Sequence, residues 1–279
     1  MRAFHLRTPI VALISLLLTA PVYADGSGGG GDARPSVSGP IFDVTHFDVI
    51  PLAPPQADID FQQKAYGLLF KYRDASRSDA GLESFRIVNW VIASNHSQII
   101  DVWHSLEAFN RHLAQPHSVK FRFAVQGNPD LCCIGSPIDD RQYTLVHSFN
   151  TPWTSNTLPS TVGSMSALYV VTYADFLQEV LEADPGEAAQ ELARYGAASS
   201  KANGKHLLNY TVLQQLDRPN RFAILEVWDT QANYTAWQSS ETTADFIDEI
   251  SPLLGSPFDH RLNILCGKTF VDGIGCVPP

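Results

Sequence analysis

The chain has 279 residues, of which 44% are hydrophobic and 17% are charged, a balance that suits one large folded core or two small ones. Its formal net charge of −10 argues against nucleic acid and anionic lipid as partners, because an acidic surface repels both. After the first 24 residues no stretch is apolar for long enough to cross a bilayer, so the sequence predicts no membrane insertion.

Residues 1–24 have the order of a secretory signal peptide. Arg2 and Arg7 give a positive start, residues 10–20 are largely apolar, and small residues precede a cut at Asp25. The sequence therefore predicts an exported protein, periplasmic or extracellular, whose formal charge falls from −10 to −12 when the two arginines are removed. Residues 25–40 are rich in Gly, Ser and Pro, which predicts a flexible leader.

The next part of the chain, residues 41–150, predicts a small α+β domain. Periodicity and β-branched content predict strands at 42–50, 84–92, 97–103 and 141–149, and helices at 58–76, at 105–114 and near 117–125. Ser105 is a good N-cap for the second helix. The order β-α-β-β-α-β is the split arrangement of ferredoxin-like domains.

The same pattern occurs a second time. The string GSPIDDR at 135–141 returns as GSPFDHR at 255–261, and KYRDASRSDAG at 71–81 aligns with RYGAASSKANG at 194–204. This repeat predicts a second domain over 165–270, after a linker at 151–164 and before a tail at 271–279. Its predicted elements are strands near 167–176, 205–214, 221–228 and 261–267, with helices near 184–200 and 230–250.

Each predicted sheet has one face covered by helices and one bare face. Two such sheets in one chain can bury their bare faces against each other, giving a closed barrel-like core with helices outside. The sequence thus predicts an intramolecular pseudo-dimer, and a monomer is the simplest expectation.

The four cysteines are Cys132, Cys133, Cys266 and Cys276. An even count in an exported chain predicts structural disulfides, with three possible pairings. Arg141 and Arg261 open the last strand of each copy beside Asp139 and Asp259, which predicts ion pairs that fix the strand starts.

Several motifs recur in the same order in both copies. A strand reads VTHFDVI at 44–50, an acidic-x-Trp motif ends a central strand at 101–103 and 226–228, and an aromatic residue follows six positions later. In copy one the next helix ends HLAQPH at 112–117. On these motifs the chain resembles the antibiotic biosynthesis monooxygenase family of dimeric α+β barrels. The resemblance implies small aromatic substrates such as quinols, oxidised by O2 without metal or flavin, in a pocket between each sheet and its helices.

The resemblance also implies the site residues. As catalytic candidates it gives His112, Trp103, Trp228 and Tyr234, and as substrate-contacting candidates Phe109, His117, Trp237, Tyr173 and His46. An imidazole with a pKa near ~6.5 suits a general base, and a tyrosine hydroxyl or indole N–H can donate to a developing anion. Position 112 is matched by Trp237 and position 109 by Tyr234, so the copies have diverged, and we expect at most one to keep a full site.

Other interpretations stay open. The tryptophans also suit core packing, and His112 also suits a bridge between helix and loop. A binding protein that keeps the pocket without the chemistry is the second hypothesis, and an ionisable group facing an enclosed cavity distinguishes the two. Trp237 resembles the pocket tryptophan of haem-degrading relatives, but Ile247 stands where their iron-ligating histidine is expected, which argues against haem. The histidines show no metal-ligand spacing, so no metal site is predicted.

Overall fold

The computed structural model describes residues 39–48, 58–92, 95–126, 139–159, 161–162, 165–266, 269–271 and 275–277. All of them belong to one structural unit, Val37–Pro279. The predicted signal peptide, most of the predicted leader, Cys132 and Cys133 lie outside the described residues.

The two predicted copies, here called repeat one (41–150) and repeat two (165–270), have the same order of main elements. Repeat one consists of β1 (Ile41–Asp48), α1 (Asp58–Ser76), β2 (Leu82–Trp90), β3 (His96–Trp103), α2 (Leu106–Leu113), α3 (Pro116–Gln126) and β4 (Asp139–Asn150). Repeat two consists of β7 (Leu168–Asp175), α4 (Gln178–Ala183), α5 (Glu187–Asn203), β8 (Leu207–Gln215), β9 (Arg221–Trp228), α6 (Gln231–Gln238), α7 (Glu241–Ile250), a 3₁₀ turn (Ser251–Leu253) and β10 (Asp259–Leu265).

The strands of both repeats form one closed antiparallel barrel in the order β1-β3-β2-β10-β7-β9-β8-β4. Within each repeat the sheet has the ferredoxin-like order, and the outer strands pair across repeats, β4 with β8 and β10 with β2. The predicted fold class, two ferredoxin-like repeats forming an intramolecular dimeric α+β barrel, is confirmed.

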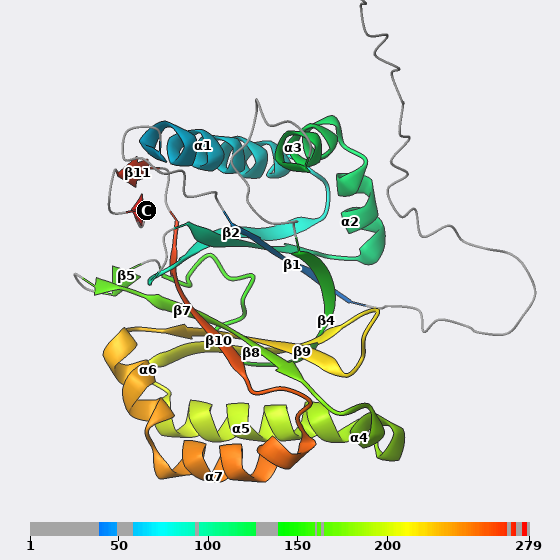
Figure 1. Ribbon diagram of the computed structural model, residues 1–279, viewed down its shortest axis with the longest axis vertical. Coiled ribbons are helices and arrows are strands. Elements are labelled where there is room, and N and C mark those ends of the chain that lie inside the picture. Colours follow the sequence, from blue (N-terminus) through cyan, green and yellow to red (C-terminus); the bar gives the residue numbers. More distant parts are fainter. Residues whose placement is uncertain are drawn as a thin grey trace, which may run out of the picture. The chain divides into compact units, whose positions relative to one another are not determined.

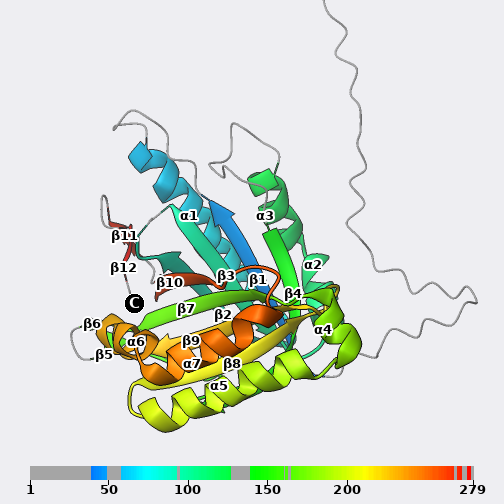
Figure 2. The same ribbon diagram turned by 60° about the horizontal axis from the view of Figure 1, so that its bottom comes forward.

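Because side chains alternate between the two faces of each strand, the protein has a core inside the barrel and further cores between the barrel and the helices. Inward-facing residues of both repeats form one shared cluster inside the barrel, which includes Phe42, Val44, Tyr169, Val171 and Leu213. Outward-facing residues pack under the helices of their own repeat, as in the cluster of Leu168, Val170 and Ala174. Figure 1 shows α1, α2 and α3 over one side of the barrel and α4, α5 and α7 over the opposite side, and Figure 2 gives the same arrangement from a second direction.

The connection between the repeats, predicted as a linker, is packed against the barrel over its described part. Trp153 is buried within the shared inner cluster, and its carbonyl oxygen accepts a hydrogen bond of 2.6 Å from the Arg86 guanidinium. Two short strand pairs form separate two-stranded sheets, β5 (Thr161–Val162) with β6 (Met165–Ser166) and β11 (Thr269–Val271) with β12 (Gly275–Val277).

Repeat two differs from the expected elements in its helices. α4 precedes the predicted start of the first helix at 184, and Asp184-Pro185-Gly186 separates it from α5. The helix expected at 230–250 is two helices, because Ser240 breaks the run and caps α7 by accepting a hydrogen bond of 3.2 Å from the Thr243 N–H. None of the helices in the described ranges has the length and apolar character needed to cross a membrane.

The ion pairs expected at the starts of the last strands are present. Arg141 bonds Asp139 at 2.9 Å through Nε, and Arg261 bonds Asp259 at 2.9 Å through an Nη atom. Cys266 is buried directly after β10, and the pairing of the cysteines stays a prediction.

Candidate functional site

Each repeat has a buried polar site between the outer face of its sheet and its helices. In both, an acidic residue and a tryptophan two positions apart on the central strand point to the helix side, because side chains two apart share a face. The pairs are Asp101 and Trp103 on β3, and Glu226 and Trp228 on β9. The acidic-x-Trp motif therefore places a carboxyl group under the helices in both halves.

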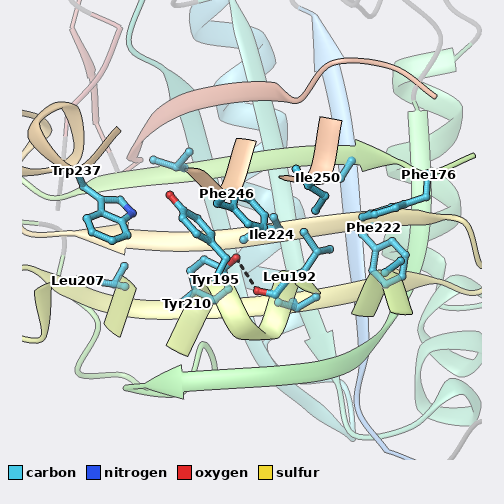
Figure 3. Packing of buried hydrophobic residues seen from close by; sticks show 14 of the residues in the cluster. Phe176, Leu192, Tyr195, Leu207, Tyr210, Phe222, Ile224, Trp237, Phe246 and Ile250 are labelled. Atoms are coloured by element: carbon cyan, nitrogen blue, oxygen red, sulfur yellow. Dashed lines mark hydrogen bonds between the residues drawn. The ribbon is translucent and has the colours of Figure 1, made fainter. Parts of the chain in front are cut away.

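Repeat two contains a cavity at this place, with a volume of about 20 Å³, enough for about one water molecule. Figure 3 shows the buried cluster to which part of its lining belongs, with the rings of Tyr195 and Phe246 beside each other; Trp237, further along, is not a lining residue. The lining residues are Thr172, Tyr195, Tyr210, Ile224, Glu226, Gln238, Thr243, Phe246, Ile247, Phe258 and His260.

Glu226 is the acidic group of this cavity. Its side chain is 3% exposed, and its Oε1 has no hydrogen-bond partner among the described residues. Burial raises its pKa to about 8, with the nearby Trp228 indole acting in the opposite direction. A carboxyl group with this pKa can take up and release a proton near neutral pH.

Hydrogen-bond donors and an aromatic ring surround this carboxyl group. The Tyr195 ring stacks on Phe246 at 4.1 Å, and its hydroxyl lies 3.0 Å from Thr243 Oγ1. Burial raises the pKa of Tyr195, so the phenol keeps its proton. The indole nitrogens of Trp228 and Trp237 are buried without a hydrogen bond of normal geometry in the described structure. The site thus combines one proton acceptor with a buried phenol, and the two indoles lie nearby without being among the residues that line the cavity.

His260, at the start of β10, lies on the other wall of the cavity. Burial lowers its pKa, and its Nδ1 lies 2.8 Å from Thr172 Oγ1. It is a neutral polar group at pH 7. Tyr234 is not among the lining residues; it packs edge-on against Trp228 at 5.9 Å. Burial raises the pKa of Tyr234 as well.

In repeat one the corresponding space holds a connected polar network. His112 is 1% exposed and stacks on Trp103 at 4.4 Å. Its Nδ1 lies 2.6 Å from Asp79 Oδ2, and its Nε2 lies 2.7 Å from the Tyr72 hydroxyl. Burial lowers the pKa of His112, with the bond to Asp79 acting in the opposite direction. Both ring nitrogens are therefore in use.

Two acids of repeat one share the strand face with this network. The Trp103 indole N–H donates to Asp101 Oδ2 at 2.6 Å, and burial raises the pKa of Asp101 to about 7. Asp43, opposite Asp101 on β1, also has a raised pKa, because it is buried and the charges of Asp140 and Asp101 oppose its ionisation. Gln142 donates to Asp43 Oδ1 at 2.8 Å. Unlike Trp228, Trp103 has no spare N–H for a substrate.

The remaining predicted residues fall into two groups. Phe109 lies 6.4 Å from Trp103, and His117 Nε2 lies 2.9 Å from Asp79 Oδ2, so both belong to the site of repeat one. His46 and Tyr173 alternate with outward-facing residues and point to the inner side of the barrel. There the Arg261 guanidinium lies 4.9 Å from the Tyr173 ring and 2.8 Å from His46 Nδ1. The structure therefore does not bring these two residues to the helix-side sites.

Glu226, Tyr195 and His260, which line the cavity of repeat two, are not among the site residues predicted from the sequence. Sequence features could have identified two of these residues, Glu226 and Tyr195. Glu226 precedes Trp228 by two positions on a strand, so the same alternation that buries the indole also buries the acid. Tyr195 matches Tyr72 in the aligned segments 71–81 and 194–204.

Comparison with known proteins bears on the fold and the family. A sequence model of the antibiotic biosynthesis monooxygenase family matches residues 177–249. A putative monooxygenase of Fusobacterium nucleatum is 14% identical with a TM-score of 0.60, over 82% of this chain and 93% of that chain. A putative monooxygenase of Lactobacillus acidophilus is 13% identical with a TM-score of 0.56, over 86% and 99%.

A third solved structure, an anthrone oxidase-like protein, is 14% identical with a TM-score of 0.56, over 84% of this chain and 95% of that chain. No curated protein sequence matches the chain significantly. At such low identities the solved structures show a shared fold, and the sequence match lies in repeat two. Residues 177–249 thus match the antibiotic biosynthesis monooxygenase family, in agreement with the resemblance found in the sequence.

Proposed function

We propose that the protein is an exported monooxygenase that oxidises quinols or related small aromatic compounds with O2 and without a cofactor. We assign the reaction to repeat two. The observation that carries this assignment is Glu226, a buried carboxyl group with a pKa of about 8 that lines a cavity between sheet and helices and has one oxygen without a partner among the described residues.

The chemistry needs a base, a dry site and donors for an anion. In the proposed reaction ionised Glu226 takes a phenolic proton, and the electron-rich anion that remains can reduce O2 itself. One oxygen atom enters the ring and the other leaves as water, so that a quinol and O2 give a hydroxyquinone and H2O. The phenol of Tyr195, which keeps its proton and lines the cavity, can donate a hydrogen bond to the phenolate.

The cavity as it stands, about 20 Å³, is smaller than an aromatic ring. Binding therefore requires side chains of α6 and α7, which carry Trp237 and Phe246, to move away from the sheet. This requirement applies equally to the second hypothesis, in which repeat two binds small aromatics without oxidising them. The largely aromatic and aliphatic lining favours binding of a ring in either case.

The test is O2 consumption by the metal-stripped chain with a panel of reduced quinols, with heat-treated protein as the control. We expect uptake above the control, with kcat/KM rising about tenfold per pH unit up to a plateau above pH 8, where Glu226 is ionised. Saturable binding of the same quinols without O2 uptake would instead support the binding function.

A further inference from the structure

A second polar cluster lies in repeat one, where the turn after α1 meets α2 and α3. Asp79 is in the turn, His112 in the last turn of α2 and His117 in the first turn of α3. His112 Nδ1 lies 2.6 Å and His117 Nε2 lies 2.9 Å from the same oxygen, Asp79 Oδ2. Two imidazole nitrogens and one carboxylate oxygen from three segments thus converge within 4.8 Å of one another.

This donor set suits a divalent transition-metal ion. Imidazole and carboxylate together are ligands that Zn²⁺ accepts readily. With bonds of about 2.0–2.1 Å, neighbouring ligand atoms of a tetrahedral zinc site lie roughly 3.3 Å apart. The observed 2.6 and 2.9 Å therefore need to widen by well under an ångström. The side chain of His117 is 23% exposed, which gives an ion access from solvent.

The ring nitrogen of His112 that faces away from Asp79 lies within hydrogen-bonding distance of two hydroxyl groups. His112 Nε2 lies 2.7 Å from the Tyr72 hydroxyl and 3.0 Å from Ser118 Oγ. A metal-ligating histidine characteristically donates its other N–H to such a partner, which fixes the tautomer and the ring orientation. When a metal takes Nδ1, Nε2–H can donate to either oxygen without any side chain being moved.

Repeat two shows that the fold does not require these three residues. The aligned positions hold Ala202, Trp237 and Thr242, none of which can serve as an imidazole or carboxylate ligand. The ring stack of the site is nevertheless the same in both halves, Tyr72 on Phe121 and Tyr195 on Phe246, each at 4.1 Å. The triad of repeat one is therefore an addition to a scaffold that packs without it.

A second group of similar composition, His46, Asp48 and His96, is a poorer metal site. The Arg261 guanidinium donates to His46 Nδ1 at 2.8 Å, so that the proton of this neutral ring lies on Nε2, the nitrogen that faces Asp48. That nitrogen then has no lone pair for a metal, and the adjacent guanidinium repels a cation. This group serves as an internal comparison for the triad.

We propose that Asp79, His112 and His117 bind one divalent transition-metal ion, best matched by Zn²⁺, which ties the turn after α1 to α2 and α3. The ion has a structural role. It neither supplies nor needs the oxidation assigned to repeat two, so the two proposals succeed or fail separately.

The test is calorimetric titration of the chelator-treated, tag-free chain with Zn²⁺. We expect one Zn²⁺ per chain, and binding weakened at least about tenfold to a hundredfold by His117→Ala and by Asp79→Asn, because removal of a ligand costs at least as much as removal of its outer support. Ser118→Ala should weaken binding by about tenfold. The matched controls His96→Ala and Thr242→Ala should stay within about threefold of the unmodified chain, because neither touches the ligands.

Two further measurements give independent readouts. Zn²⁺ should raise the Tm of the unmodified chain and not that of His117→Ala, whereas Mg²⁺, which prefers oxygen ligands, should raise neither. Co²⁺ in place of Zn²⁺ should give the visible absorption of a four-coordinate site. His117→Gln, which keeps most of the side-chain volume, replaces the alanine variant if that variant unfolds.

The proposal is overturned if the unmodified chain binds no Zn²⁺ saturably, or if the His117 variants bind it as the unmodified chain does. Loss of binding in His96→Ala but not in Asp79→Asn would also overturn it, because the ion would then lie at the other histidine group.

Discussion

The two repeats have the same aromatic scaffold and differ in the polar groups around it. In repeat one His112 is held between Asp79 and Tyr72, with both ring nitrogens bonded. In repeat two the matching position is Trp237, and Glu226 lines a cavity; its Oε1, like Asp101 Oδ1 of repeat one, has no hydrogen-bond partner among the described residues. In each repeat the tyrosine–phenylalanine stack joins two helices, α1 to α3 and α5 to α7, whereas the polar residues around the stack differ between the repeats. Repeat one holds its histidine in a network of polar contacts, and repeat two places a buried proton acceptor beside a cavity.

The sharpest test of this comparison replaces the matched acids one at a time. Glu226→Gln should lower quinol-dependent O2 uptake by about 10²-fold or more, because it removes the base of the proposed reaction. Asp101→Asn changes the equivalent acid of repeat one and should leave uptake within about threefold, since Asp101 is bonded to Trp103 and lies in the other repeat. Equal losses of O2 uptake in both variants would show that the reaction is not confined to repeat two.

Glu226→Gln, which should lower O2 uptake, should raise the free energy of unfolding at alkaline pH. The folded-state pKa of Glu226 is about 8, against an ordinary value of 4.5. Since the folded state holds this proton more tightly than the unfolded chain, its stabilising contribution is complete below pH 4.5 and is lost as the pH rises towards 8. Glu226→Gln should therefore be more stable than the unmodified chain by about 2 kcal/mol at pH 9, but not at pH 5. Urea unfolding at the two pH values measures this, and a pH-independent difference would contradict it.

A smaller contrast is expected between the two stacked tyrosines. Tyr72→Phe and Tyr195→Phe each remove one buried hydroxyl contact, to His112 and to Thr243, and each should cost about 1 kcal/mol in the free energy of unfolding. Only Tyr195 lines the cavity of repeat two, so only its variant should also lower turnover, by about tenfold. Chemical unfolding and O2 uptake, measured on both variants, separate the shared role from the specific one.

The smallest effect is expected at Tyr234. It packs against Trp228 outside the lining of the cavity, so Tyr234→Phe should change turnover by less than about threefold. A large loss of O2 uptake, with an unchanged Tm, would move the site from the Glu226 side of Trp228 to the Tyr234 side.

Local pattern was enough to predict the fold. The strand at 221–228 and the helix at 58–76 were predicted with the bounds that the structure has, because alternation and helical spacing are clear there. The missed helix α4 has only six residues and no side-chain hydrogen bond at its N-cap. The break between α6 and α7 depends on the Ser240 cap, which a continuous apolar pattern conceals.

The sites were harder to predict, because they depend on side chains from distant segments. His112 and Trp103 were identified together, and the structure stacks them. Asp79 is 33 residues from His112 and carries no motif of its own, so nothing local connects it with the two histidines. Glu226 was noticed as part of a motif, but its raised pKa follows from burial under α6 and α7, which only the packed structure shows.

The two seams that join the repeats are unequal. β4 and β8 are paired through seven residue pairs from Tyr143 to Asn150, whereas β10 and β2 are paired through three. A barrel tends to open where the fewest backbone hydrogen bonds hold it, so the β2–β10 seam is its natural hinge. His260, on β10, lines the cavity of repeat two. Transient separation of β10 from β2 would therefore free this wall of the cavity to move. The amide hydrogens of Val91 and Cys266, which donate across this seam to the carbonyl oxygens of Leu262 and Ile87, should accordingly exchange with solvent sooner than those along the longer seam.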